Sequence, residues 1–206
     1  MKFILSAFLF ILSITTSFAQ QAPPEYFETA TIKAKFGVRV VFTSRKHAIT
    51  LDVASDQVKS TEHPYVILVG KQILQFAFTP VIYDTLARTA DQQRELVLGY
   101  MKSEIDYAKK ILNMAEITST TEWVNINGKP FLLWSYYLAP GDKSNVVKQS
   151  YLCTYAYGRV LSINSPLIKD DNETTAKELM MQIGKTFMQY NNYIDLEKLY
   201  KAMQNQ

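Results

Sequence analysis

The dipeptide Asn127-Gly128 constrains the fold of this chain most, because this pair best tolerates the positive backbone angles of a two-residue β-hairpin turn. The segments on either side, residues 116–126 and 129–138, have the composition of strands. Two further strand-like segments, residues 146–157 and 160–164, flank Gly158-Arg159. We therefore predict four consecutive strands that form one antiparallel meander.

A long amphipathic helix is predicted ahead of this meander. Thr89 and Gln92 have the spacing of a capping box, in which each side chain bonds the backbone of the other residue. Asn113 suits the left-handed position that ends a helix. Between these ends, apolar residues recur every three or four positions and form one stripe: Val97, Met101, Ile105, Ala108 and Leu112.

A second helix is predicted after the meander. Residues 166–171 lead into it, and either Asn172 or Thr174 can cap it. Its apolar stripe is expected to consist of Leu179, Met180, Ile183 and Phe187. Residues 191–206 are predicted to form a C-terminal helical tail, with its helix over residues 193–203.

Strands are also expected before the first helix. Residues 29–44 contain many β-formers, and Gly37 marks a bulge or a turn between two short strands. Residues 47–53 alternate between polar and apolar side chains, which is typical of a half-buried strand. A polar connection over residues 55–63 precedes a strand pair over residues 65–79, broken at Gly70-Lys71, and residues 84–88 are expected to be a loop. The chain is thus predicted to be α+β, with an antiparallel sheet of about six or more strands packed with helices, in one domain over residues 29–190.

The N-terminus has the pattern of a secretory signal peptide over residues 1–19. Lys2 precedes an apolar run over residues 3–14, and Ser17-Phe18-Ala19 provides small residues for cleavage. The run is shorter than the roughly 20 residues that span a bilayer. We expect an exported product in the periplasm or the medium, soluble after cleavage near Ala19 and without a membrane span. Residues 20–28, with Pro23-Pro24, are expected to be an extended lead-in.

Charge and cysteine content narrow the function classes. The formal charge of +3 is too small to indicate a nucleic-acid surface. Cys153 is the single cysteine, so no internal disulfide is expected. Its strand context favours a buried thiol, while a role as nucleophile would require a base from His47 or His63.

No catalytic residue, metal site or cofactor is predicted. Two histidines fall short of the three or four ligands of a zinc site unless carboxylates converge on them. The Gly-x-Ser-x-Gly nucleophile elbow is absent from the sequence. A pair among Glu104, Asp106 and Glu122 could cleave a sugar bond if it faced a cleft, but such carboxylates on a surface helix usually face water.

Aromatic residues are concentrated in the meander. Strand alternation places Trp134 and Tyr136 on the face opposite to Phe131, so both faces of the sheet carry rings. If the helices cover only one face fully, the other face exposes an aromatic platform for a ligand. The candidate ligand-binding residues are Trp123, Trp134, Tyr136, Tyr151 and Tyr155.

The segment from Tyr65 to Tyr190 resembles the PsbP/Mog-type α/β/α sandwich family. The resemblance includes the helix over residues 89–112, the hairpin over residues 122–130, the run Gln149-Ser150-Tyr151 continuing into residues 157–161, and the closing segment over residues 183–187. It implies a sandwich fold without a common active site, in a family whose members mainly bind other proteins or help to assemble complexes. The region before Tyr65 departs from the family pattern, so its strands are expected to be arranged differently.

These observations predict an exported, non-catalytic binding or interaction module of the cell envelope, with another envelope protein as its partner. The alternative is a binder of small molecules, carbohydrates or lipids, or a weak hydrolase, with an aromatic-lined pocket between sheet and helix. A purely structural envelope component is a third possibility that the sequence does not separate from the first.

Overall fold

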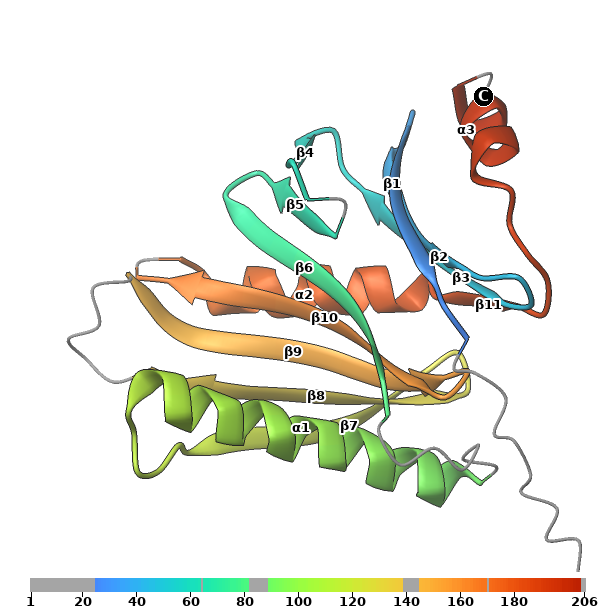
Figure 1. The fold of residues 1–206 in the computed structure, drawn as a ribbon. Coiled ribbons are helices and arrows are strands. Elements are labelled where there is room, and N and C mark those ends of the chain that lie inside the picture. The colour runs from blue at the N-terminus through green and yellow to red at the C-terminus, as the bar shows by residue number, and fades with distance from the viewer. Residues whose placement is uncertain (1–24, 64, 82–88, 139–144, 170, 205–206) are drawn as a thin grey trace, which may run out of the picture.

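The computed structural model describes residues 25–63, 65–81, 89–138, 145–169 and 171–204. The predicted signal peptide, most of the extended lead-in and the expected loop at residues 84–88 lie outside these residues. Within them the chain forms two antiparallel sheets and three helices (Figure 1). The predicted α+β class is therefore confirmed.

The larger sheet has seven strands in the order β4-β5-β6-β10-β9-β8-β7. Its last four strands are neighbours in both sequence and space, as the meander predicted. The bounds are β4 (Val58–Ser60), β5 (Val66–Val69), β6 (Gln72–Pro80), β7 (Ser119–Ile126), β8 (Lys129–Tyr137), β9 (Val146–Ala156) and β10 (Arg159–Ile168). Strand β4 falls in the segment predicted to be a polar connection.

The two hairpin turns of the meander differ from each other. Asn127 and Gly128 take φ angles of 52° and 81° and join β7 to β8, as predicted. The β9–β10 turn is formed by Tyr157 and Gly158, at φ 48° and 74°, and Arg159 already pairs with Ala156. The prediction of a turn at Gly158-Arg159 was therefore wrong by one residue, because Tyr157 adopts a conformation that bulky side chains rarely take.

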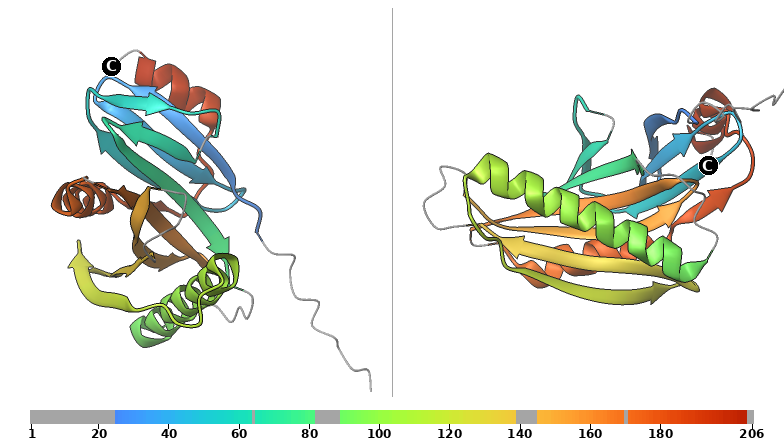
Figure 2. Two further views of the ribbon diagram at one scale, coloured as in Figure 1. Left: turned by 90° about the vertical axis from the view of Figure 1, so that its left-hand side faces the viewer. Right: turned by 60° about the horizontal axis from the view of Figure 1, so that its bottom comes forward.

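Helix α1 (Ala90–Leu112) crosses one face of the larger sheet, in contact with β8, β9 and β10 (Figure 2). Its capping box is present: the Gln92 backbone N–H donates to Thr89 Oγ1 at 3.2 Å, and the Thr89 N–H donates to Gln92 Oε1 at 3.1 Å. Asn113 ends the helix at φ 52°. The predicted stripe faces the sheet, with Val97, Met101 and Ala108 buried.

Helix α2 (Glu173–Lys185) covers the opposite face and begins at the Asn172 cap. Two sequence predictions are corrected here. Strand β10 continues through Pro166 to Ile168, because Pro166 keeps its pairing with Gln149, so the lead-in is shorter than expected. Phe187 lies beyond the end of α2 and does not belong to its stripe, which has Ala176, Met180 and Ile183 as its buried side chains.

The smaller sheet has the order β1-β2-β3-β11, with β1 (Glu28–Ala34), β2 (Gly37–Thr43), β3 (Ala48–Ala54) and β11 (Met188–Tyr190). The sequence missed β11, a short strand that pairs with β3. Strand β3 was predicted to be half-buried, but it is buried on both faces. Its Thr50 pairs with Val41 of β2, and Val41 packs against the segment that leads into α3 (Leu196–Gln204). Helix α3 itself contacts β1.

The main apolar core lies between the two sheets and includes side chains of α2, and a second core lies beneath α1. Helices therefore cover both faces of the larger sheet, as expected for the predicted sandwich (Figure 2). Among the described residues, no helix is both long and apolar enough to cross a membrane.

Candidate binding cleft between the two sheets

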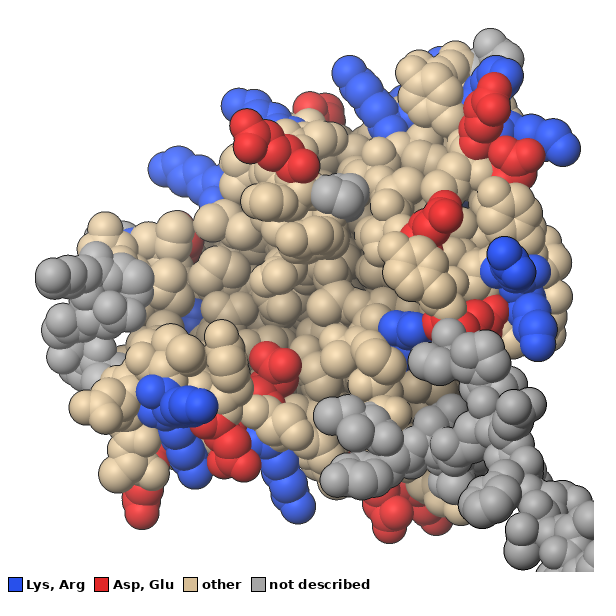
Figure 3. Space-filling model, viewed as in Figure 1, with Lys and Arg blue, Asp and Glu red and all other residues tan. Residues whose placement is uncertain are grey.

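A cleft of about 360 Å³ lies where the smaller sheet meets β5 and β6. Its lining is mainly aromatic and contains no charged side chain: Phe27, Thr29, Phe42, Tyr65, Gln75, Phe76, Ala77 and Phe78. Figure 3 shows the hollow from the viewpoint of Figure 1, where the surface between β5–β6 and β1 is free of Lys, Arg, Asp and Glu. The cleft is therefore an uncharged, ring-lined depression, with Thr29 and Gln75 as its polar side chains.

Rings from both sheets form the floor of the cleft. The Phe78 ring of β6 lies edge-on to Phe27, with centroids 4.8 Å apart, and 5.3 Å from the Phe42 ring of β2. Phe42 and Phe76 are buried, whereas Tyr65 at the mouth is 39% exposed and stacks on His63. Such aromatic pairs add to the stabilisation from burial alone, so the floor is a fixed surface.

Two strands that contribute to the cleft have an edge without a neighbouring strand. Strand β1 is the end strand of its sheet and pairs with β2. Strand β6 pairs with β5 only through residues 72–75, while β10 pairs along residues 75–80 on its other side. In the described part of the chain, β1 and residues 77–80 thus each pair with a strand on one side alone, and Arg159 bonds the Phe78 carbonyl. Backbone edges of this kind can pair with an added strand.

Arg159 contacts two of the rings that line the cleft. Its guanidinium carbon lies 5.1 Å from the Phe27 ring centroid and 5.7 Å from that of Phe78, within the range of cation–π attraction. Nη1 donates to the Phe78 carbonyl at 3.2 Å, and Nη2 donates to the Glu25 carbonyl. Since Phe78 belongs to the larger sheet and Glu25 precedes the smaller one, Arg159 ties the two sheets together.

Next to Arg159, the Glu25 carboxylate holds a group of side chains that we call the clasp, comprising Glu25, Ser44, His47, Tyr157 and Arg159. Ser44 Oγ donates to the carboxylate, and His47 Nδ1 lies 2.7 Å from Glu25 Oε2. Burial tends to raise the pKa of Glu25, but the bonds from Ser44 and His47 outweigh it, so the pKa is lowered. The His47 ring also stacks on Tyr157, with centroids 4.2 Å apart.

The clasp contains the residue types of a hydrolase triad in a different arrangement. In a triad, the histidine lies between the serine and the acid and takes the proton of the serine. Here Ser44 and His47 both bind Glu25, and the Ser44 hydroxyl also bonds the His47 carbonyl at 2.9 Å. The geometry is that of an anchored turn, in which Glu25 fixes the start of the smaller sheet.

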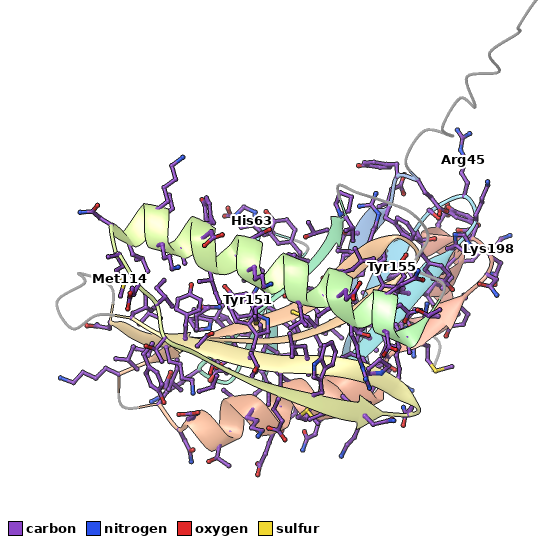
Figure 4. All side chains as sticks on the ribbon, turned by 90° about the horizontal axis from the view of Figure 1, so that it is seen from below. Arg45, His63, Met114, Tyr151, Tyr155 and Lys198 are labelled. Atoms are coloured by element: carbon purple, nitrogen blue, oxygen red, sulfur yellow. The ribbon has the colours of Figure 1, made fainter. Side chains whose placement is uncertain are left out.

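The aromatic residues predicted as ligand-binding lie beneath α1. Figure 4 shows Tyr151 and Tyr155 between this helix and the sheet, and both are buried. Trp134 and Tyr136 are buried with them, while Trp123 is half-buried under the Arg94 guanidinium. Because α1 covers this face, the expected open platform is not found there, and a ligand-binding role for these rings stays a prediction.

Trp134 forms the centre of this covered cluster. Its ring stacks on Tyr151 with centroids 3.9 Å apart and an interplanar angle of 4°. Trp134 Nε1 also donates to the Cys153 Sγ at 3.4 Å. Burial raises the pKa of Cys153 to about 12, so the thiolate is strongly disfavoured. His47 and His63 contact Glu25, Tyr157 and Tyr65 instead, and Cys153 is a buried, inert thiol.

The three carboxylates considered for sugar hydrolysis do not share a cleft. Glu104 is half-buried beside Tyr100, and burial raises its pKa. Asp106 lies 3.8 Å from Lys109, and Glu122 lies 3.1 Å from Lys177 on the far side of the sheet. Among the described residues, no group of three or more His, Cys, Asp or Glu side chains could hold a metal ion.

The residues of the aromatic cleft were missed from the sequence. Phe27 lies in the predicted lead-in, and Phe42, Phe76 and Phe78 belong to segments that were predicted as strands without a binding role. The repeated apolar residues of β6, with Phe76 and Phe78 two positions apart, mark one strand face. Nothing in that pattern shows that a second sheet meets this face and leaves a hollow.

No protein-family model and no curated protein matches this chain. Among solved structures, it is similar to the solution structure of cyanobacterial PsbP (CyanoP) from Synechocystis sp. PCC 6803. The two chains are 14% identical with a TM-score of 0.43, and the match covers 77% of this chain and 94% of the other. This match falls within the family that the sequence resembles. At this level of similarity it supports no argument about function.

Proposed function

We propose that the protein is an exported, non-catalytic binding module of the cell envelope, which recognises an extended apolar segment of a protein partner in the aromatic cleft. The observation that carries this proposal is the ring-lined cleft at the junction of the two sheets, to which the end strand β1 contributes Thr29. A segment in the cleft can bury apolar side chains on the rings of Phe27 and Phe78. Its backbone can pair with the edge of β1, as in other cases of strand addition.

The signal-peptide pattern of residues 1–19 supports the export and the envelope setting of the proposed partner. The clasp supports a preformed site, because Arg159 bonds both Phe78 of the larger sheet and Glu25 next to the smaller sheet. A preformed cleft loses little conformational entropy on binding, which favours affinity.

The test compares variants in the recovery of partners from an envelope extract. Thr29→Arg adds a charge within the apolar lining, and Tyr65→Ala removes the exposed ring at the mouth. We expect both variants to bind a partner of the wild type at least tenfold more weakly, which corresponds to a loss of about 1.4 kcal/mol in binding free energy. Tyr107→Ala, at an exposed tyrosine of α1, is the matched control and should retain the partner. Unchanged recovery by both cleft variants would reject this site.

A small apolar ligand is the second candidate for the same cleft, since its volume lies near the lower end of the usual range for small-molecule sites. Thermal-shift screening against lipids and sugars separates the two functions, because a ligand that binds the folded state raises the melting temperature with its concentration. A shift that Thr29→Arg abolishes would favour the small ligand. Partner capture without any such shift would favour the protein segment.

A further inference from the structure

A second, polar groove of about 210 Å³ lies between α2 and the strands β7, β8 and β9, separate from the aromatic cleft. Three hydroxyl groups form a row across its floor, because Thr120 pairs with Ser135 and Ser135 pairs with Ser150. The Thr120 and Ser135 hydroxyls bond each other at 2.8 Å. The Ser150 hydroxyl has no hydrogen-bond partner among the described residues and is available to a ligand.

Lys148 provides the fixed charge of this groove. Its side chain is only 7% exposed, and Nζ donates to Glu173 Oε1 at 2.5 Å and to the Tyr137 hydroxyl at 3.4 Å. Burial of an ammonium group is costly unless an anion accompanies it. Lys148 and Ser150 are two residues apart on β9, so their side chains project from the same face towards the groove.

Glu173 supplies that anion from the rim. Its side chain is 52% exposed at the first position of α2, and its one hydrogen bond within the described structure is the bond to Lys148. Because half of its surface is exposed, the Glu173 carboxylate can turn into water if another anion takes its place beside the buried Lys148. A carboxylate inside the groove could bond both Lys148 and Ser150, which Glu173 does not do.

We propose that this groove binds a short-chain monocarboxylate, whose carboxylate replaces that of Glu173 on Lys148 and also accepts a hydrogen bond from Ser150. Leu133 and Met180 provide an apolar wall for the short chain of the ligand. The groove is smaller than the roughly 300–1,000 Å³ of sites for drug-sized ligands, so the ligand has few atoms beyond its charged group. Lys177 also lines the groove and pairs with Glu122 at 3.1 Å, so Lys148 is the cation left for a ligand once Glu173 turns away.

The test is a titration of the full mature chain with butyrate, followed by NMR of the backbone amides at constant ionic strength. We expect butyrate to shift the signals of β9 and of the start of α2, while butyramide, its neutral counterpart, does not. Glu173→Gln should bind butyrate more tightly than the wild type, by roughly tenfold if the internal carboxylate occupies Lys148 nine-tenths of the time. Ser150→Ala should weaken binding several-fold, and Lys148→Met should abolish it.

Glu197→Gln is the matched control, because Glu197 forms an exposed pair with Lys201 at the same 2.5 Å distance on α3. It should leave butyrate binding unchanged. The proposal is overturned if Glu173→Gln binds no more tightly than the wild type, if butyramide binds as well as butyrate, or if the shifts spread over exposed lysines as for an adventitious ion only. Since Glu173→Gln and Ser150→Ala leave Lys148 in place, the test stands even if Lys148→Met does not fold.

Discussion

Tyr157 takes a backbone conformation that costs free energy for a bulky side chain, at φ 48° in the β9–β10 turn. Contacts of its ring offset this cost. The ring stacks on His47, and the hydroxyl donates to Asn191 Oδ1 at 3.2 Å. Tyr157 therefore connects the clasp to the segment after β11. The strained backbone of the turn is what allows its side chain to reach both.

Gly184 on α2 is required by close packing. A Cβ atom at this position would lie 2.9 Å from Leu152 Cδ2 and 3.0 Å from Ile126 Cδ1. We expect Gly184→Ala to lower the free energy of unfolding by up to about 2 kcal/mol, since an overpacking cost of about 1–3 kcal/mol exceeds the gain of up to about 1 kcal/mol from the helix propensity of alanine. Urea denaturation measures this loss. Gly99→Ala on α1 is the control, because its Cβ would meet no atom within 4 Å, and it should stabilise the protein by up to about 1 kcal/mol.

Cys153 should not react with thiol reagents in the folded protein. The side chain is fully buried, and burial raises its pKa to about 12, so both access and thiolate formation are blocked. Reaction with an aromatic disulfide reagent at pH 8, followed by absorbance, should proceed at the rate of unfolding and become fast in urea. A fast reaction of the native protein would contradict the buried position.

Glu104 should reduce stability as the pH rises. Burial raises its folded pKa above the usual 4.5 although Tyr100 bonds it, so the folded state binds the proton more tightly than the unfolded state does. Stability is then lost as the pH increases from 4.5 through the folded pKa. We expect Glu104→Gln to match the wild type below pH 4 and to melt at a higher temperature at pH 7. Thermal melts across this range provide the measurement, and equal melting temperatures at pH 7 would argue against the raised pKa.

At the scale of elements, the clasp should make the smaller sheet sensitive to acid. The folded pKa of Glu25 is lowered, so its contribution is complete above the usual value of 4.5 and is lost as the pH falls through the folded pKa. We expect Glu25→Gln to cost up to about 1 kcal/mol at pH 7, a small value because the group is partly exposed, and less than that at pH 3. Melting temperatures at both pH values test this expectation, with Glu28→Gln on β1 as the exposed control. An equal loss at both pH values would show that the charge of Glu25 is not responsible.

Elements set by local chemistry could be predicted from the sequence. Asn127-Gly128 determined one hairpin, and Thr89, Gln92 and Asn113 determined both ends of α1. Strand β11 escaped because a three-residue strand has no periodicity and forms only through its pairing with β3. Pro166 suggested the end of a strand, yet the pairing of β10 with β9 continues past it.

The aromatic cleft could not be predicted either, because it also depends on contacts between distant parts of the chain. Its rings come from segments far apart in sequence, and their meeting depends on the place of β1 beside β6. The sequence did locate the cluster of Trp134, Tyr136 and Tyr151, but strand alternation does not tell which face α1 covers. The polar groove depends similarly on the register that aligns Thr120, Ser135 and Ser150.

At the scale of the whole molecule, the two sheets do not have separate cores. The main core takes Val40 and Leu51 from the smaller sheet, Phe76 and Leu161 from the larger sheet, and Met180 from α2. Separating the sheets would expose these apolar faces to water, at a cost of roughly 25 cal/mol for each Å². Neither sheet is therefore expected to persist without the other.

This shared core predicts a single cooperative transition on heating, despite the division of the strands into two sheets. Scanning calorimetry should give a van't Hoff enthalpy equal to the calorimetric enthalpy, as for a two-state protein. A calorimetric value clearly above the van't Hoff value would reveal independent melting units. Agreement would mean that a partner bound in the aromatic cleft protects the entire polypeptide against thermal denaturation, since both of its walls belong to one thermodynamic unit.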